Sequence, residues 1–327
     1  MNRAYLFITA LFVLIFMSCQ SAKKNNTERQ NEVELVAEKQ LVFPLDEQTY
    51  YLSKSMFQFE ENGKEYLHFE NTQKSLYDIV IFDIENRQIA KRIPLSKTGP
   101  NGLPAVSGSR PSPDSEQILI SQNNIGRLST INNQGEVVRN YPVESPEGRF
   151  TAFFFCSYYN TPAFVKDSCI FLNQDILKPN MKREDWPQTH MFASLNLKTG
   201  KFKWVPIFYP PIFKEEYDNI AGGYGFSYDY NYKENRLVCG FFGYDSLMVT
   251  DDLKHIRWYN AKSRYLKSMK PKLGNAMAGI NSIIEFCETP KYWHIMYDKY
   301  RDVYYRFAEM PYKLAPNESP YDEPKGK

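Results

Sequence analysis

The sequence predicts an all-β protein folded as a β-propeller of four-stranded blades. Aromatic residues make up 16% of the chain, with 24 Tyr and 23 Phe, and such residues favour strands. The chain is interrupted by 20 Pro and 16 Gly, and no long segment shows the 3.6-residue apolar period of a helix. One strand–turn–strand unit also recurs along the chain, which indicates a repeat architecture.

The recurring unit has alternating apolar positions on both sides of a turn rich in Asn, Asp, Gly or Lys. Alternation places one face of each strand in a core, and the turn residues accept the dihedral angles of a tight reversal. The four copies occupy residues 76–95, 127–143, 191–207 and 246–261. Their turn centres, which are 48, 65 and 53 residues apart, are Asn86, Gln134, Thr199 and Asp252. The longest interval contains a polar insertion at residues 176–189, so the underlying period is about 50 residues.

Two further strands precede each of these hairpins and complete the blades. We predict these pairs at residues 56–59 with 65–69, 104–107 with 117–121, 153–158 with 169–173, and 226–230 with 237–241. Four strands in about 40–50 residues are typical of a propeller blade. Because a blade cannot bury both of its faces alone, neighbouring blades must stack around an axis.

The C-terminal region predicts a fifth blade that is incomplete or truncated. Residues 295–307 form a hairpin with its turn near Arg301, and one strand, residues 282–286, clearly precedes it. This hairpin is either the outer or the inner pair of its blade. Residues 40–45 are the candidate strand to complete the last blade and close the ring. The propeller domain then spans residues 40–310, with a loop-like tail at 311–327.

The N-terminus predicts a lipoprotein signal peptide at residues 1–18. A basic start precedes the apolar run 4–17, which is too short to span a bilayer comfortably, and the run ends at Ser18 and Cys19. We expect Cys19 to carry the lipid and residues 19–39, which are polar, to form a flexible tether. The alternative is an ordinary secretory signal. Gln20 after the lipidated residue favours the outer membrane, with the periplasmic side favoured over the cell surface.

Four segments together carry a family resemblance. They are the lipobox-like residues 16–19, GPNGLP at 99–104, YDKYRDVYYRF at 297–307 and SPYDEPKGK at 319–327. With these segments the chain resembles a family of Bacteroidetes lipoproteins, the domain of unknown function 4221 group, and is similar to six-bladed propeller lipoproteins of the same envelopes. The resemblance implies a propeller on a lipid anchor and no transferable catalytic residue. Relatives continue with further strands where this chain stops, which implies an incomplete ring.

Composition and motifs argue against several classes of site. A net charge of +2 favours neither nucleic acid nor a strongly acidic partner. No CxxC or HExxH motif occurs, so we predict no metal site, and no nucleotide-binding motif occurs, so we predict no cofactor. Cys156 and Cys169 lie at nearly symmetric distances from a turn at Thr161-Pro162 and could form a cross-strand disulfide. The alternative is that they are small buried hydrophobic residues.

The strongest candidate for a binding site is the aromatic stretch at residues 222–232. Alternation places Phe226, Tyr228 and Tyr230 on one face of a strand and Asp229 on the other. With Tyr224, these rings could stack on a sugar or peptide while Asp229 binds polar groups. The alternative is packing between blades, where aromatic residues are the usual filler. Trp186 lies in the polar insertion and is a candidate loop contact.

The sequence therefore predicts a lipid-anchored envelope propeller that acts as a ligand-binding or protein-assembly module. Its expected partners are the membrane, through the lipid, and a glycan, a peptide or an envelope protein. The alternative is a propeller-scaffold enzyme acting on glycans, either a hydrolase or a lyase, because the fold alone does not decide between these roles. No catalytic residue can be named, since no GxSxG or comparable motif is present.

Overall fold

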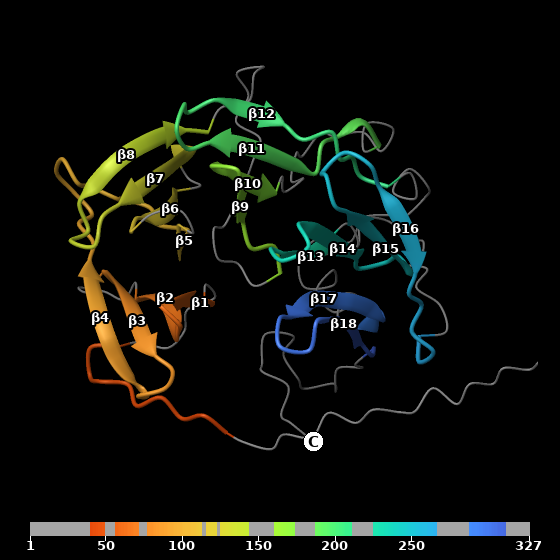
Figure 1. Cartoon of the computed structure of the whole chain (residues 1–327), viewed down its shortest axis with the longest axis horizontal. Coiled ribbons are helices and arrows are strands. Elements are labelled where there is room, and N and C mark those ends of the chain that lie inside the picture. Colours follow the sequence, from red (N-terminus) through yellow and green to blue (C-terminus); the bar gives the residue numbers. More distant parts are fainter. Residues whose placement is uncertain are drawn as a thin grey trace, which may run out of the picture. The chain divides into compact units, whose positions relative to one another are not determined.

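The computed structural model of the protein describes residues 40–49, 56–71, 77–112, 116–122, 125–143, 160–173, 187–210, 225–266 and 288–311. The chain divides into two compact units, Met1–Val42 and Phe43–Lys327. The first unit lies almost wholly outside the described residues, so the signal peptide, Cys19 and the tether stay predictions. The second unit contains all the strands of the described part, β1 to β18 (Figure 1).

The strands form antiparallel sheets that follow one another around a centre (Figure 1). Blade 1 consists of β1 (Met56–Glu61), β2 (Lys64–Asn71), β3 (Asp78–Asp83) and β4 (Gln88–Pro94). Blade 2 consists of β5 (Gly108–Pro111), β6 (Ile118–Gln122), β7 (Arg127–Ile131) and β8 (Val137–Pro142). Blade 3 consists of β9 (Phe164–Lys166), β10 (Cys169–Asn173), β11 (Phe192–Asn196) and β12 (Phe202–Trp204).

Blade 4 consists of β13 (Phe226–Asn231), β14 (Arg236–Phe241), β15 (Ser246–Thr250) and β16 (Arg257–Asn260). Blade 5 contributes two strands to the described part, β17 (Lys291–Asp298) and β18 (Val303–Glu309). In each blade the first strand lies nearest the centre (Figure 1). The predicted all-β propeller with four-stranded blades is confirmed. Among the described residues, no helix has the length and apolarity needed to cross a membrane.

The core forms where the apolar faces of neighbouring blades meet. Its largest cluster joins blades 3 and 4, with Phe164 of β9 and Phe192 of β11 against Tyr228 of β13. The aromatic rings meet at 6.2 Å and 5.0 Å between centroids, both edge to face. Aromatic residues thus fill the wide space between the sheets, as expected when twisted sheets pack face to face.

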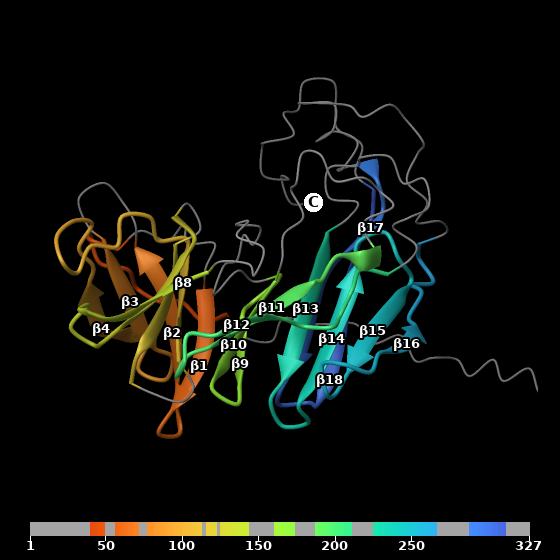
Figure 2. The same ribbon diagram turned by 90° about the horizontal axis from the view of Figure 1, so that it is seen from above.

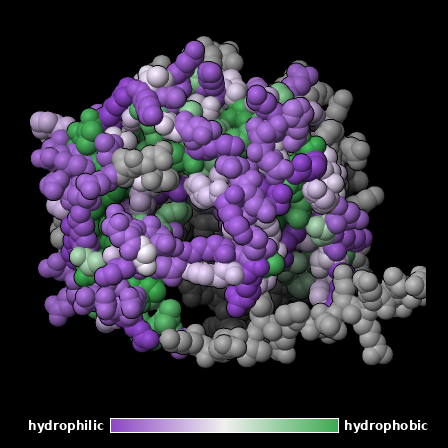
Figure 3. Space-filling model, viewed as in Figure 1, coloured by the Kyte–Doolittle hydropathy of each residue, from purple (hydrophilic) through white to green (hydrophobic). Residues whose placement is uncertain are grey.

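Side chains connect blade 5 directly to blade 1. Lys299, in the turn after β17, pairs with Glu65 at 2.8 Å and with Glu60 at 3.3 Å. The hydroxyl of Tyr300 donates a hydrogen bond to Glu65 and accepts one of 3.2 Å from the side chain of Gln58. The face of the molecule shown in Figure 3 is mostly hydrophilic, with a hollow near the centre.

Blade 5 presents its inner pair of strands. β17 packs beside β13 and β14, and Ile295 of β17 is buried against Val238 and Val249 of blade 4. The hairpin predicted at residues 295–307 is therefore the inner pair of the two alternatives. The strand predicted at residues 282–286 lies outside the described residues.

The segment at residues 40–45 does not form the predicted closing strand, and that prediction is wrong. None of these residues is in a strand. Instead, the ring of Phe43 packs edge to face on Phe82 of β3 at 6.0 Å, and the nearby Asp46 pairs with Arg92 of β4 at 2.6 Å. The contacts of Phe43 and Asp46 hold this segment against the first blade, and Pro44 has no N–H to donate to a strand ladder.

Two predicted inner strands are also shifted. The strand of blade 2 predicted at residues 104–107 begins at Gly108, because Pro104 continues the preceding turn and cannot donate to a ladder. In blade 3, residues 153–158 lie outside the described part, but both edges of β10 are already occupied, by β9 and β11. The pairing predicted between 153–158 and 169–173 is therefore wrong.

The β9–β10 hairpin also removes the reason for the proposed disulfide. The chain reverses at Asp167 and Ser168, whose φ angles of 51° and 60° suit a two-residue hairpin turn, and not at Thr161-Pro162. Cys169 then lies opposite Lys166, and it forms no disulfide with another described residue. Cys156 lies outside the described residues, so the bond itself stays a prediction without its geometric basis.

Candidate functional site

The inner strands create a cavity at one end of the propeller. Because every blade repeats the same antiparallel meander from the centre outward, the inner strands run in one direction and their carboxyl ends meet. The turns that follow β1 and β13 lie at the same end (Figure 2). There, a cavity of about 1280 Å³ is lined by the ends of β1, β5, β13 and β17 and by the turns after them.

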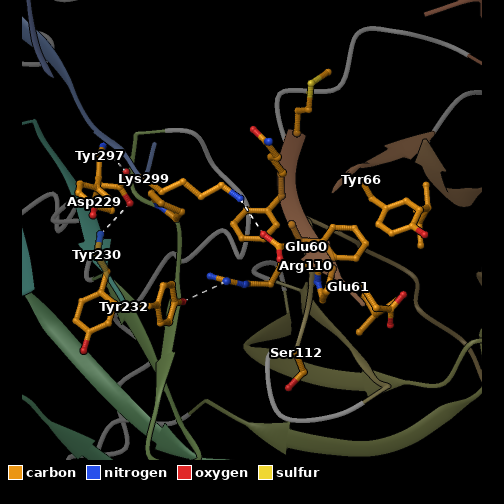
Figure 4. Close-up of a pocket in the computed structure, with 18 of the residues that line it drawn as sticks. Glu60, Glu61, Tyr66, Arg110, Ser112, Asp229, Tyr230, Tyr232, Tyr297 and Lys299 are labelled. Atoms are coloured by element: carbon orange, nitrogen blue, oxygen red, sulfur yellow. Dashed lines mark hydrogen bonds and ion pairs between the residues drawn. The ribbon is translucent and has the colours of Figure 1, made fainter. Parts of the chain in front are cut away.

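Arg110 of β5 is the most buried charged residue lining this cavity. Only 3% of its surface is exposed, and its guanidinium lies 4.4 Å from the ring centroid of Phe57 on β1. Its Nη2 donates a 3.3 Å hydrogen bond to the hydroxyl of Tyr232 across the cavity (Figure 4). Within the described part of the chain, its Nε–H has no hydrogen-bond partner. Arg110 therefore brings a positive charge and an unused donor to the cavity wall.

Asp229 of β13 links blades 4 and 5 at the opposite wall (Figure 4). Its two carboxylate oxygens accept 2.8 Å hydrogen bonds from the backbone N–H groups of Tyr230 and Tyr297. Burial raises the pKa of Asp229 to about 6, although these two bonds and the charge of Arg110 oppose the shift. Asp229 is thus a structural acceptor that titrates near neutral pH.

The raised pKa of Asp229 predicts a pH-dependent stability. The pKa is 3.8 without the fold and about 6 within it, so folding favours the protonated acid. Below about pH 4, Asp229 is protonated in both the folded and the unfolded protein, and its burial costs no stability. As pH rises through about 6, the free energy of unfolding falls by about 3 kcal/mol, because the buried acid has to ionise. The wild type should therefore lose stability between pH 4.5 and 7.5, and Asp229→Asn should not. Urea unfolding of both proteins at both pH values measures this difference.

Asp83→Asn is the matched control for this measurement. The backbone N–H and the side-chain amide of Asn86 hold the pKa of Asp83 below its usual value, so it stays ionised throughout this pH window. The stability difference between Asp83→Asn and the wild type should therefore be the same at pH 4.5 and 7.5. A constant difference for Asp229→Asn as well would contradict the raised pKa.

A buried polar network lies beside Arg110, where blade 1 meets blade 2. Ser109 of β5 lies 2.6 Å from Nε2 of His68 and donates a 2.5 Å hydrogen bond to Glu70. All three side chains are buried, and burial lowers the pKa of His68 to about 3, so the imidazole is neutral. This network joins blades 1 and 2. Its serine lies between a neutral imidazole and a carboxylate, away from solvent, so it does not resemble an activated nucleophile.

Ion pairs join several of the charged residues at the rim of the cavity. Lys299 extends over the cavity from blade 5 toward Glu60 of blade 1 (Figure 4). Its ion pairs with Glu65 and Glu60 raise the pKa of Lys299, and the same contact lowers that of Glu65. Lys233 pairs likewise with Asp302, at 3.4 Å. Among the described residues, no group of three His, Cys, Asp or Glu side chains is arranged to hold a metal ion.

Comparison with known families identifies the chain. The model of the domain of unknown function 4221 (DUF4221) matches residues 32–326. The chain belongs to this family. A DUF4221 member from Bacteroides vulgatus ATCC 8482 has a crystal structure at 84% sequence identity, with a TM-score of 0.83 over 91% of this chain and 82% of that one. The family inferred from the sequence is therefore confirmed.

More distant structures show weaker likeness to this DUF4221 chain. A putative exported protein from Bacteroides fragilis NCTC 9343 is 10% identical, with a TM-score of 0.48 over 82% of this chain and 74% of that one. A streptogramin B lyase is 13% identical, with a TM-score of 0.36 over 83% of this chain and 72% of that one. No curated protein matches the chain.

The structure separates the predicted binding residues of this DUF4221 chain into two groups. Phe226 and Tyr228 belong to the core between blades 3 and 4, and Tyr228 has no exposed surface, so its ring fills the core and cannot stack on a ligand. Tyr230 is largely buried in the same core but borders the cavity, as does Asp229 on the other face of β13. Trp186 and Tyr224 lie outside the described residues and stay predictions.

Sequence reasoning missed three residues of the cavity lining. Arg110 and Phe57 come from other blades, on β5 and β1, and Tyr232 is the last residue of the aromatic stretch, directly after β13. One sequence signal for Arg110 existed, because a charged residue within a short inner strand is unusual unless it faces a partner or a cavity. The shifted boundary of β5 hid that signal, since the predicted strand ended before Arg110.

Proposed function

We propose that this protein is a binding module of the cell envelope that holds a small ligand, of sugar or short-peptide size, in the central cavity. The observation that carries the proposal is the cavity itself, of about 1280 Å³, bordered by four blades and lined by aromatic rings beside polar groups. Ligand sites are typically concave, largely apolar and aromatic, with a few fixed polar groups. The signal sequence and Cys19 support an envelope location.

The aromatic lining suits binding because part of it is accessible. Tyr232 is 49% exposed and Tyr300 is 67% exposed, while Phe57, Phe59 and Tyr66 are partly buried. Phe59 and Tyr66 stack on each other at 5.4 Å, which holds both rings in one orientation. Rigid rings with one polar group provide contact area at low entropic cost, as flat sugar faces and extended peptides require.

Binding is favoured over glycan hydrolysis by the state of two cavity carboxylates, Asp229 and Glu60. A glycoside hydrolase commonly uses two free carboxyl groups on either side of the scissile bond. Here Asp229 already accepts two backbone hydrogen bonds, and Glu60 pairs with Lys299. Both acids thus hold blades together.

A calorimetric titration of the purified full chain with neutral and acidic mono- to tetrasaccharides and with di- to tetrapeptides tests the proposal. We expect at least one compound class to bind, and Tyr232→Ala to weaken that binding about tenfold or more, as for aromatic residues at the centre of an interface. The matched control is Tyr265→Ala, because Tyr265 is 61% exposed and lies outside the cavity lining. Absence of binding, or equal losses in both variants, would contradict the proposed function.

A further inference from the structure

The charge of Arg110 has fewer compensating contacts than the charges of two other arginines, Arg92 and Arg306. Arg92 pairs with Asp46 and Asp78 at 2.6 Å each, and the guanidinium of Arg306 donates to several backbone carbonyl oxygens. Arg110 is more buried than either, yet no carboxylate of the described residues pairs with it. An unpaired buried charge costs several kcal/mol, so a fold retains one chiefly where a partner arrives from outside.

The orientation of Arg110 leaves one edge of the guanidinium for that partner. Phe57 covers a face of the planar group, so acceptors must approach in its plane. On the edge formed by Nε and Nη2, Nη2 makes one long bond to Tyr232 and Nε–H is unused. The Tyr232 hydroxyl also accepts a 3.3 Å bond from the backbone N–H of Val165, so its own hydrogen is free to donate. Two N–H donors and one O–H donor therefore converge.

We propose that the ligand of the central cavity carries a carboxylate group, and that Arg110 binds this group through Nε and Nη2 while Tyr232 donates to it. This inference rests on the proposed function. A planar carboxylate matches the edge of a guanidinium with two parallel N–H···O bonds. Binding would neutralise the buried charge, and the rings beside it, Phe57 and Tyr232, would contact the body of the ligand.

The surrounding charges favour a single negative charge over a phosphate dianion. The charged side chains that line the cavity are five acids and four bases: Glu60, Glu61, Glu116, Asp229 and Asp298, with Lys91, Arg110, Lys233 and Lys299. The lining therefore carries no excess of positive charge beyond what one negative charge on a ligand would use. A second negative charge would be repelled by the acidic side chains. Uronic acids and peptide α-carboxylates share the required chemistry.

Matched acid and neutral ligands test this inference on the full chain by calorimetry at pH 7.5. The pairs are D-glucuronate with D-glucose, D-galacturonate with D-galactose, and N-acetylphenylalanine with its amide. We expect the acid of at least one pair to bind ten or more times more tightly than its neutral partner. A preference found in the sugar pairs would identify a uronic acid as the ligand, and one found in the peptide pair would identify a peptide α-carboxylate. Glucose 6-phosphate binding more tightly than glucuronate would overturn the choice of a carboxylate.

Variants then assign the preference to Arg110. Arg110→Met should abolish the difference between acid and neutral ligands without lowering the thermal midpoint, because it removes a buried charge with which no carboxylate of the described residues pairs. Arg110→Lys should keep part of the preference, and Tyr232→Phe should reduce it while neutral ligands bind as before. Arg87→Met, at an exposed turn between β3 and β4, is the control and should change nothing. If Arg110→Met does not fold, Arg110→Lys and Tyr232→Phe carry the test.

The outcomes separate this inference from the proposed function. Binding of neutral and acidic ligands with equal affinity, weakened by Tyr232→Ala, would overturn the carboxylate inference and leave the binding module in place. An acid preference that survives Arg110→Met would overturn the role of Arg110. A thermal midpoint lowered in Arg110→Met, with the preference unchanged, would show that the arginine acts in folding. Absence of any binding would overturn both proposals.

Discussion

Tyr228→Ala should lower the free energy of unfolding by about 3–5 kcal/mol. The side chain has no exposed surface, and its ring contacts those of Phe164, Phe192 and Phe226 with centroid distances of 6.2, 5.0 and 5.9 Å. Its hydroxyl donates a 3.2 Å hydrogen bond to the carbonyl of Thr161. Truncation leaves a cavity between blades 3 and 4 and removes this buried hydrogen bond.

Urea and thermal unfolding of the full chain measure this effect. For a domain of this size, each kcal/mol corresponds to about 2–4 °C in the thermal midpoint, so the loss should be clear. Tyr265→Ala is the control, because Tyr265 is 61% exposed and its removal should change the midpoint by little. A near-native midpoint for Tyr228→Ala, together with a weaker affinity for ligand, would instead restore Tyr228 as a binding residue.

Gly135→Ala should also cause a large loss of stability, of about 2–4 kcal/mol. Gly135 lies in the β7–β8 turn with a φ angle of +81°, which residues with a side chain rarely adopt. An added Cβ would lie 1.9 Å from the carbonyl oxygen of Pro94, at the end of β4 in the neighbouring blade. The atom in the way belongs to the backbone and cannot rotate aside as a side chain could. Blades 1 and 2 would therefore have to move apart.

Gly200→Ala separates the two causes of this loss. Gly200 occupies the corresponding turn of blade 3 with a φ angle of +74°, but the nearest atom to an added Cβ is 3.8 Å away. This variant should lose only the conformational contribution, about 1 kcal/mol. The measurement is the difference between the two variants in urea unfolding. Equal losses would mean that the close approach of the two blades contributes nothing to stability.

The binding residues could be predicted from the sequence only in part. Alternation correctly assigned Phe226 and Tyr228 to one face of β13 and Asp229 to the other, since side chains of a strand alternate regardless of context. Whether this aromatic face packs in the core or faces a ligand depends on the neighbouring blade. Phe164 and Phe192 of blade 3 pack against it and make it part of the core. Asp229 borders the cavity because β17 approaches β13 from a distant part of the chain.

The sequence by itself determined the period, the recurring outer hairpins and the number of strands in a blade, because two-residue alternation and turn chemistry are local properties. The tertiary structure alone decided where Phe43 packs, which pair of strands blade 5 presents, and that Arg110 faces the end of β13 across a cavity. Those outcomes depend on contacts between residues up to hundreds of positions apart. No local pattern encodes such contacts, since they arise only when the blades stack around a common centre.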